Sequence, residues 1–230
     1  MKRKLLNVKV IGCGGVGGCL LNVLPRTLTH LKDFNASLTL VDGDAYTNEN
    51  ETRQEFTRLG QKADVTKERL SRLHPALLVS AVTNYITTQN IGLVIKEGDI
   101  VFCCVDNHAT RKLLSEHCET LRNVTLFSGG NREFDGNVQV YIRKDGVDVT
   151  RPLTYLHREI ENPKDHNPGD AEAGCDVLVN TSPQYLATNN IVAALMFKHF
   201  DLYLRGGFDG DNAFDELFFA DDGKSRTVKR

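Results

Sequence analysis

The chain has 230 residues, of which 40% are apolar and 25% are charged. This length suffices for one hydrophobic core and leaves no room for a second catalytic domain, so we expect a single domain over residues 1–230. The 28 Lys and Arg residues nearly balance the 30 Asp and Glu residues, and the net charge of −2 offers no global attraction for nucleic acid or a membrane surface.

No segment is apolar enough to span a bilayer, and the basic start of the chain leads into a predicted strand rather than into the apolar core of a signal peptide. The six cysteines form no C-x-x-C pair, the spacing that structural zinc sites and thioredoxin-like redox motifs use. We therefore expect a cytoplasmic protein with free thiols and without zinc.

Apolar runs of strand length alternate with amphipathic stretches through the first half of the chain. This alternation is typical of repeated βαβ units, and it predicts an α/β fold with a Rossmann-like, doubly wound, mostly parallel sheet. The predicted strands are residues 8–11, 38–41, 77–82, 100–104 and 125–127. The predicted helices are residues 16–31, kinked at Pro25, followed by 62–73 and 109–121.

The pattern changes after residue 127. Residues 136–143 alternate as a strand does before the turn Asp145-Gly146, so antiparallel strands should extend the sheet. Residues 150–174 are polar and contain three prolines, which predicts a mobile crossover loop over about 150–175.

A helix is expected over 182–200, capped by Ser182 with Pro183 in its first position, and a hairpin is expected over about 213–229. The apolar stripe of this late helix is predicted to be core or a dimer seam; it comprises Leu186, Ile191, Val192, Leu195 and Met196.

A glycine-rich loop, residues 12–18, follows the first predicted strand and opens the first predicted helix. Its glycines (Gly12, Gly14, Gly15 and Gly17) let the backbone approach a phosphate, whose charge the amides at the helix start can meet. Asp42 ends the next strand, where a carboxylate can accept hydrogen bonds from ribose hydroxyls. The pair predicts a nucleotide site; the alternative is tight packing by the glycines, with Asp42 as a turn residue.

The residues after Asp42 favour ATP over NAD. Arg53 can hold phosphate oxygens in a bidentate fork, and Lys62 can act as a point charge; both would stabilise charge on the α-phosphate. Asp44, Asn50 and Gln54 belong to the same run. The pyrophosphate of a dinucleotide needs fewer cations, although either cation alone could be a solvated residue on a helix face.

The fourth predicted strand leads into Asp106-Asn107. Ligands of open parallel sheets bind at the carboxyl ends of the strands, so Asp106 should face the same crevice as the glycine loop. A carboxylate next to an amide suits Mg²⁺ bound to phosphates, which makes Asp106 the candidate metal ligand. The alternative is that one of the two residues caps the following helix.

Together these motifs resemble the E1-like superfamily of ThiF and MoeB type, whose members adenylate ubiquitin-like proteins and sulfur carriers. The resemblance covers residues 8–200. It rests on Gly12 to Gly17, Asp42-x-Asp44, Asn50 with Arg53-Gln54, Gly60-Gln61-Lys62, Asp106-Asn107 with Arg111, and Ser128-Gly129.

The resemblance implies that the C-terminal carboxylate of a ubiquitin-like or sulfur-carrier-like protein attacks the α-phosphate of Mg·ATP, giving an acyl-adenylate and pyrophosphate. It also implies that Asp42 binds ribose, that Asn50, Arg53 and Lys62 contact phosphates, and that Asp106 is the aspartate linked to Mg²⁺. A homodimer is the assembly that the family likeness favours.

The chain departs from the family pattern at two places. It lacks the two C-x-x-C pairs of longer members, and its first strand replaces the helix that donates an arginine to the neighbouring subunit's site. Arg3 and Lys4 remain as substitutes for that arginine. This shorter build is more similar to the compact ThiF-like proteins of bacterial and phage gene clusters.

Cys175, at the end of the predicted crossover loop, is a candidate to accept the activated acyl group as a thioester, because a thiolate near phosphate-binding cations is a nucleophile. An ordinary free cysteine is the alternative. Two other functions remain open: an NAD(P)-binding oxidoreductase, suggested by the glycine loop with Asp42, and a non-catalytic ThiF-like binding module, suggested by the missing arginine helix.

Overall fold

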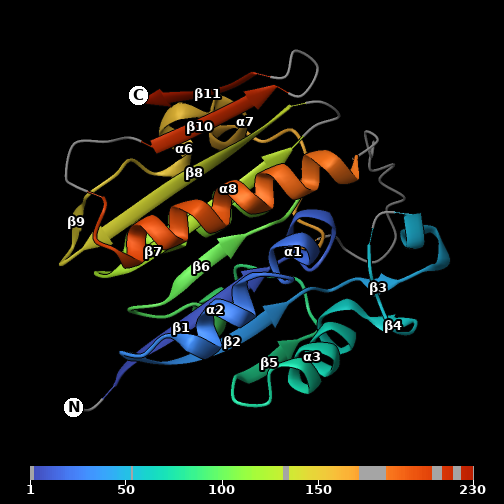
Figure 1. Ribbon diagram of the computed structural model, residues 1–230. Coiled ribbons are helices and arrows are strands. Elements are labelled where there is room, and N and C mark those ends of the chain that lie inside the picture. Colours follow the sequence, from blue (N-terminus) through green and yellow to red (C-terminus); the bar gives the residue numbers. More distant parts are fainter. Residues whose placement is uncertain are drawn as a thin grey trace.

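The computed structural model shown in Figure 1 describes residues 3–52, 54–131, 135–170, 185–208, 214–219 and 224–229. Within these residues a central sheet is covered by helices on both faces. The helices are α1 (Gly15–Leu20), α2 (Leu24–His30), the 3-10 helix η1 (Asn48–Thr52), α3 (Lys62–Leu73), α4 (Ile91–Val94), α5 (His108–Thr120), α6 (Leu153–Leu156), α7 (Arg158–Glu161) and α8 (Leu186–Leu204).

The main sheet of the described residues has nine strands in the order β11-β10-β8-β7-β6-β1-β2-β5, with β9 paired to β8. Neighbours from β5 to β7 pair in parallel, whereas β8 to β11 pair antiparallel. This arrangement confirms the predicted α/β fold, a mostly parallel sheet extended by antiparallel strands. The strands are β1 (Lys4–Ile11), β2 (Phe34–Val41), β5 (Leu78–Val82), β6 (Ile100–Cys103), β7 (Val124–Asn131), β8 (Asp135–Lys144), β9 (Val147–Asp148), β10 (Phe214–Phe219) and β11 (Lys224–Lys229), and a separate pair joins β3 (Ala45–Tyr46) to β4 (Gly60–Gln61).

The strand order places a topological switch point between β1 and β6. From β1 the chain moves outward through β2 to β5, and it then returns to β6 on the other side of β1 before continuing to β7. Ile11 pairs with Cys103, and the Cys104 amide donates to the Ile11 carbonyl over 2.8 Å. The loops that follow β1 and β6 therefore start side by side, at the place where open α/β sheets bind ligands.

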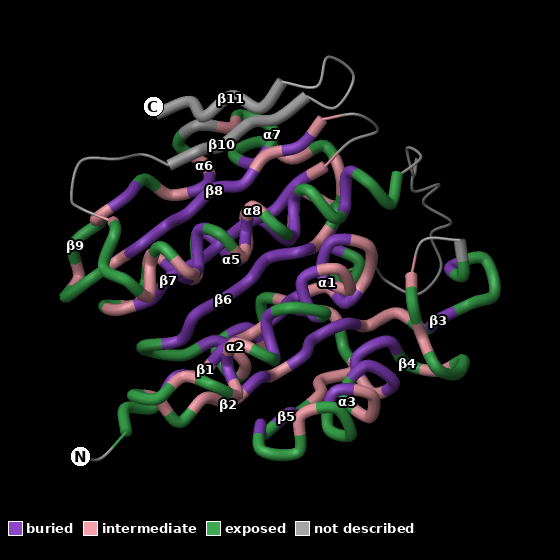
Figure 2. Tube along the Cα trace, in the orientation of Figure 1, coloured by how far each residue is buried: buried purple, intermediate pink, exposed green. Residues whose placement is uncertain are grey.

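Two hydrophobic clusters fill the spaces between the sheet and its helices. Along β6, Ile100 and Phe102 face the cluster under α1, α2, α3 and α8, whereas Val101 and Cys103 face the cluster under α4 to α7. Figure 2 shows the resulting band of buried residues along β6, β7 and β8. Burial on both faces explains why β6 is a run of apolar residues without polar alternation.

The prediction of one kinked helix over residues 16–31 is wrong. The structure has two helices, α1 and α2, and Pro25 lies in the first turn of α2. Proline is compatible with a first turn because its missing N–H has no intrahelical partner there. The proline therefore marks the start of a helix rather than a kink within one.

The prediction of an unstructured segment over 150–174 also needs correction. The short helices α6 and α7 lie in it, and they bury Leu153 and Ile160 in the cluster under α5. A helix of one turn has no sequence period to detect, so only isolated apolar residues mark it. The late helix α8 begins at Leu186 and ends at Leu204, later than predicted at both ends; Ser182 and Pro183 lie outside the described residues. None of the helices in the described ranges is long and apolar enough to cross a membrane.

Candidate functional site

The glycine loop turns tightly against the loop that follows β6. Gly12 has φ +92°, and a Cβ there would lie 2.8 Å from the Cys104 carbonyl oxygen. A Cβ on Gly17 would lie 1.9 Å from the Gly12 carbonyl oxygen. At Gly14, by contrast, a Cβ would meet nothing closer than Gln54 Nε2 at 3.8 Å. Gly12 and Gly17 thus allow close packing, and Gly14 leaves open space on one side of the loop.

Asp42 fastens the end of β2 to the glycine loop. Its Oδ2 accepts a hydrogen bond from the Cys13 amide over 2.6 Å, and its Oδ1 accepts one from the Asp44 amide over 2.8 Å. Burial raises the pKa of the Asp42 carboxyl, and these two amides oppose the rise only in part. The structure therefore brings together the two features that the sequence analysis combined into a nucleotide site.

Lys62 lies at the start of α3 with its ammonium group 2.9 Å from Asp44 Oδ2. The strand pair β3–β4 makes this contact possible, because the Lys62 amide donates to the Asp44 carbonyl over 2.9 Å. The Lys62 side chain is 9% exposed and that of Asp44 is 47% exposed. Lys62 is therefore a nearly buried cation paired with a carboxylate at the rim of the site. Its charge opposes the rise that burial causes in the pKa of both Asp42 and Cys13.

Tyr85, which the sequence analysis missed, completes this group. It follows β5, and its hydroxyl donates a hydrogen bond to Asp44 Oδ1. Burial alone would raise the pKa of Asp44, but the hydrogen bonds from Tyr85 and Lys62 outweigh it and lower that pKa. The rule that found Asp42 and Asp106, namely polar residues just after a parallel strand, could also have found Tyr85.

The segment after β3 provides two of the predicted residues. Asn50, in η1, accepts the Thr47 amide on its Oδ1 over 3.0 Å, so its side chain shapes the turn. Gln54 is the side chain nearest to the open side of Gly14, and its Oε1 is buried without a hydrogen-bond partner among the described residues. Arg53 lies outside the described residues.

Asp106 and Asn107 follow β6 and have different roles in the structure. Asn107 caps α5 by accepting the Thr110 amide on its Oδ1 over 2.8 Å, so the helix-cap alternative is confirmed for Asn107. Asp106 is exposed. The pKa of Tyr85 is raised, first by burial, then by the hydrogen bond to Asp44 and by the charges of Asp44, Asp42 and Asp106. These three carboxylates follow parallel strands and lie on the same edge of the sheet.

Arg111 does not extend into the open side of the site. It is buried, and its guanidinium donates to Ser128 Oγ over 3.2 Å and to the carbonyl oxygens of Val105 and Gly129. Because these acceptors follow β6 or belong to β7, Arg111 holds the carboxyl ends of the two strands together.

Asp165, in the predicted crossover loop, is a second residue that the sequence analysis missed. Its carboxylate accepts the amides of His108 and Ala109, at the start of α5, over 2.7 and 2.8 Å. Nearby, Asn167 Nδ2 donates to the Ile86 carbonyl over 2.8 Å. The crossover segment thus lies on the carboxyl edge of the sheet, fixed to the loops that follow β5 and β6.

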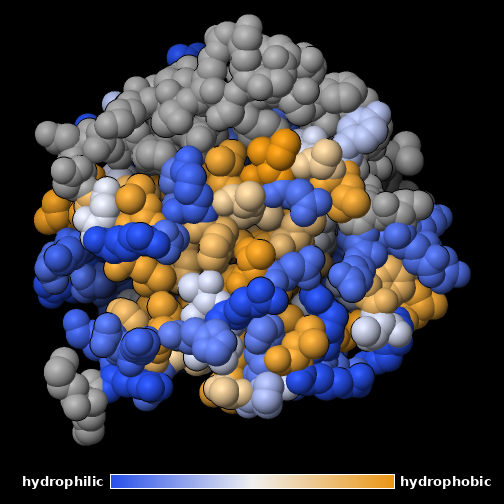
Figure 3. All heavy atoms as spheres, viewed as in Figure 1, coloured by the Kyte–Doolittle hydropathy of each residue, from blue (hydrophilic) through white to orange (hydrophobic). Residues whose placement is uncertain are grey.

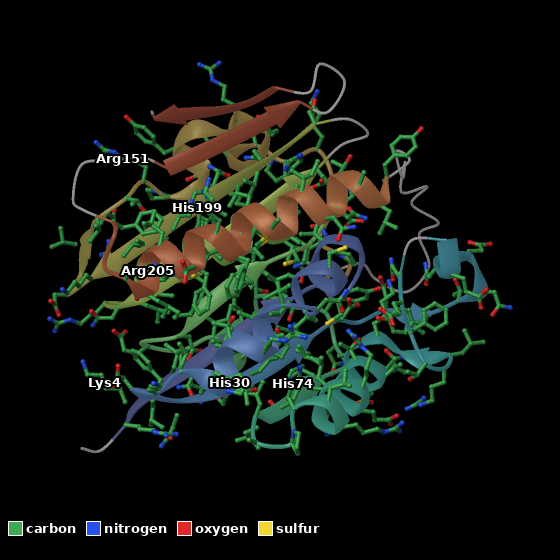
Figure 4. All side chains as sticks on the ribbon, in the orientation of Figure 1. Lys4, His30, His74, Arg151, His199 and Arg205 are labelled. Carbon is green, nitrogen blue, oxygen red and sulfur yellow. The ribbon has the colours of Figure 1, made fainter. Side chains whose placement is uncertain are left out.

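Arg3 and Lys4 lie at the opposite edge of the sheet. Figure 4 shows Lys4 at the lower left of the molecule, at the start of β1. The eight residues of β1 separate Lys4 from that loop by about 25 Å. Neither side chain can reach the nucleotide site of its own chain.

The cysteines of the described residues are free, and Cys13, Cys103 and Cys104 are buried. Burial raises the pKa of each of these three thiols, which makes them poor nucleophiles. Cys175 lies outside the described residues. Within the same residues, no three His, Cys, Asp or Glu side chains gather closely enough to hold a metal ion by themselves.

A glycine loop held by an aspartate at the switch point of a parallel sheet defines a nucleotide-binding α/β protein. The ThiF family matches residues 2–200, and the chain belongs to this family. This result confirms the resemblance that the sequence motifs indicated.

Named relatives are enzymes that adenylate. Molybdopterin-synthase adenylyltransferase of Escherichia coli K12 is 28% identical over 156 residues, which is 66% of this chain and 60% of the relative. The ThiS adenylyltransferase of the same organism is 28% identical over 145 residues, 60% of this chain and 55% of the relative. The adenylyltransferase and sulfurtransferase MOCS3 of Culex quinquefasciatus is 30% identical over 150 residues, but only 33% of its length is matched. The chain thus spans 60% or less of the length of these relatives.

Solved structures of E. coli MccB have the same fold. MccB with ATP superposes with a TM-score of 0.71 at 17% identity, covering 97% of this chain and 63% of MccB. A structure of the microcin C7 biosynthetic enzyme MccB with N-formylated MccA gives a TM-score of 0.71 at 18% identity, covering 97% of this chain and 64% of that one.

Proposed function

We propose that this chain uses ATP to adenylate the C-terminal carboxylate of a ubiquitin-like or sulfur-carrier-like protein. The proposal takes its chemistry from the relatives, two of which are named as adenylyltransferases of molybdopterin synthase and of the sulfur carrier ThiS. The single observation that supports it most is the position of Lys62. A buried ammonium group is costly unless an anion accompanies it, and this one lies 2.9 Å from the rim carboxylate Asp44, with its charge also opposing the rise that burial causes in the pKa of Asp42 and of Cys13 in the glycine loop.

In the proposed reaction, a carboxylate oxygen of the partner bonds to the α-phosphorus of ATP while the bond to the pyrophosphate leaving group breaks. The products are an acyl-adenylate and pyrophosphate. Asp42 would accept the ribose hydroxyls, and the backbone at Gly14 would face the phosphates across its open side. Lys62 and Arg53 would stabilise the charge that develops on the α-phosphate, with Asn50 and Gln54 beside them.

Asp106 fits the role of magnesium ligand. It is an exposed carboxylate at the switch point, on the same edge as Asp42 and Asp44. Mg²⁺ usually takes one or two protein carboxylates and completes its shell with phosphate oxygens and water, so it does not need a preformed cluster. Bound there, the metal would neutralise phosphate charge, and Asp106 would hold it beside the glycine loop.

An ATP:pyrophosphate exchange assay tests this function. Purified protein is incubated with Mg·ATP, labelled pyrophosphate and a bacterial sulfur-carrier protein that ends in Gly-Gly. Label entering ATP only when the carrier is present supports adenylation. The alternative, a ThiF-like module that binds nucleotide without turnover, predicts nucleotide binding without exchange for every carrier tested.

We further propose that the protein is a cytoplasmic homodimer without zinc. Five cysteines lie in the described residues; all are free and four are buried, which suits a reducing compartment. Val192 and Met196 on α8 are buried in the core, but Leu186 and Ile191 are 48% and 38% exposed. Figure 3 shows apolar side chains gathered on this face of the molecule. Light scattering that gives twice the mass of the chain, with no zinc by elemental analysis, would support this proposal.

A further inference from the structure

Asn189, near the start of α8, is a polar side chain inside the molecule. It is 0% exposed. Its Oδ1 accepts a hydrogen bond over 2.8 Å from Nδ2 of Asn131, the last residue of β7. This bond fixes the amide, because the oxygen faces Asn131 and the NH₂ group is turned away from it.

The NH₂ group of Asn189 faces the glycine loop. A Cβ built on Gly15 would lie 2.4 Å from Asn189 Nδ2, so the amide rests directly against the Gly15 backbone. Nδ2 is buried, and it has no hydrogen-bond partner among the described residues. On the Gly14 side of the loop, Gln54 Oε1 is likewise buried without a partner in this part of the chain. Two amide side chains with unused hydrogen-bonding atoms therefore flank the loop.

The position of Asn189 follows from the packing of α8. A Cβ on Gly129 of β7 would lie 2.3 Å from Met196 Sδ and 2.7 Å from Val192 Cγ1, so the helix lies in close contact with the strand. The helix cannot withdraw the amide without opening this contact. A buried amide that lacks a partner costs free energy, and an apolar side chain would avoid that cost. An amide held in this place indicates a partner that is present in another state of the protein.

We propose that Asn189 is a further nucleotide-binding residue, whose amide donates a hydrogen bond to a phosphate oxygen of the nucleotide on the glycine loop. The inference rests on the proposed function, because it takes the ligand to be ATP. Phosphate oxygens are strong acceptors, and hydrogen bonds to charged groups are the stronger ones. For a phosphate oxygen to contact Nδ2, the loop backbone at Gly15 would have to shift away from the amide. Binding would then link the nucleotide to β7 through Asn189 and Asn131.

Calorimetric titration with Mg·ATP and, separately, with adenosine tests this inference. Asn189→Ala should weaken Mg·ATP binding by roughly tenfold or more, because it removes one hydrogen bond to a charged acceptor. Asn189→Asp should weaken it further, because a carboxylate would then face the phosphates. Adenosine has no phosphate, so both variants should bind it within about twofold of the original protein.

Asn190 provides the matched control. It is the next residue of α8, it is exposed, and its Nδ2 donates to the Leu186 carbonyl over 2.9 Å. Asn190→Ala and Asn190→Asp should leave the affinity for Mg·ATP unchanged. Thermal unfolding shows whether each variant is folded, and Asn189→Ala alone decides the question if Asn189→Asp is not.

Three results separate the possibilities. Loss of Mg·ATP affinity with adenosine affinity retained supports the phosphate contact. An unchanged affinity for Mg·ATP in folded Asn189→Ala, or an equal loss for ATP and adenosine, overturns the inference and leaves the proposed function intact. An original protein that does not bind Mg·ATP at all removes the proposed function, and this inference with it.

Discussion

The ammonium group of Lys62 lies 2.9 Å from the carboxylate of Asp44, and the two side chains differ sharply in exposure. Lys62 is almost buried, whereas Asp44 stands half exposed at the rim of the site and is also held by Tyr85. An incoming phosphate therefore meets the Asp44 carboxylate before the Lys62 ammonium group, and it must displace this carboxylate to contact Lys62. The pair keeps a cation near the glycine loop before any nucleotide arrives, which avoids the cost of an unpaired buried charge.

Replacing Lys62 should reduce adenylation far more than it reduces folding. Lys62→Ala removes the charge proposed to stabilise the α-phosphate, and the expected loss in exchange rate is about 10² to 10³. Lys67→Ala is the matched control, because Lys67 lies on the same helix and is exposed. Equal exchange rates for the two variants would remove Lys62 from the reaction.

Substitutions of the neighbours Asp106 and Asn107 should have opposite effects: one should lower the exchange rate and the other the free energy of unfolding. Asp106→Ala should lower the exchange rate by about 10² to 10³ with little change in stability, because the side chain is exposed. Asn107→Ala removes the cap of α5 and should lower the free energy of unfolding by about 1 kcal/mol. Exchange rates and urea denaturation of both variants check the pair; near-normal exchange by Asp106→Ala would rule out its role as magnesium ligand.

Gly12 and Gly14 form a second contrasting pair. Gly12→Ala should destabilise the fold by about 1–3 kcal/mol, since it places a Cβ at positive φ against the Cys104 carbonyl. Gly14→Ala should fold normally, because a Cβ has room there, but it should weaken ATP binding by filling the space proposed for phosphate. Thermal unfolding and ATP titration measure the two effects. A Gly14→Ala variant with full ATP affinity would place the phosphates elsewhere.

Tyr85→Phe should change stability in a pH-dependent way. The pKa of Asp44 is lowered in the folded protein, so its contribution to stability is present above the ordinary carboxyl pKa and is lost as the pH falls through the lowered value. Without the Tyr85 hydroxyl, the folded pKa should move up and part of this contribution should vanish. The loss should be at most about 1 kcal/mol near neutral pH, because solvent screens the half-exposed carboxylate.

Urea denaturation at a series of pH values measures this effect. The difference between Tyr85→Phe and the original protein should shrink as the pH falls through the lowered folded pKa of Asp44, because the carboxyl is then protonated in both proteins. Tyr155→Phe, at an exposed position on α6, is the control and should show no such trend. A difference that stays constant with pH would assign Tyr85 a packing role only.

Cys175→Ala should spare the exchange reaction and abolish any thiol-sensitive adduct with the carrier protein, if Cys175 accepts the acyl group. Cys19→Ala is the control, because Cys19 is a free and partly buried thiol. Mass spectrometry before and after treatment with hydroxylamine detects the adduct. An adduct that persists in Cys175→Ala would refute the thioester.

Much of the fold could be predicted because the responsible signals are local. β6 was found since both of its faces are buried, and the glycine loop and Asp42 were found since each follows a strand at the switch point. The end of β7 was missed because its glycines, Gly129 and Gly130, lack strand propensity and are held by pairing with β8. Partner strands, not the sequence of the segment, extend β7 to Asn131.

The candidate site was predicted less completely for the same reason. Lys62 and Asp44 are 18 residues apart, and nothing in their spacing shows that they pair. Asp165 and Asn189 carry no motif, and tertiary packing alone brings them to the carboxyl edge of the sheet and to the glycine loop; Tyr85, which follows β5, could have been found by its position after a strand. Which of Asp106 and Asn107 caps α5 could not be read from the sequence either; the structure shows that Asn107 does so, through a local hydrogen bond.

Nucleotide preference tests the central claim most directly. Calorimetry should compare Mg·ATP with NADH for the original protein, Arg53→Ala and Asp106→Asn. We expect the protein to bind Mg·ATP, both variants to bind it more weakly, and all three proteins to bind NADH poorly. Tight NADH binding that is indifferent to Arg53, with no binding of Mg·ATP, would contradict the account and indicate an oxidoreductase.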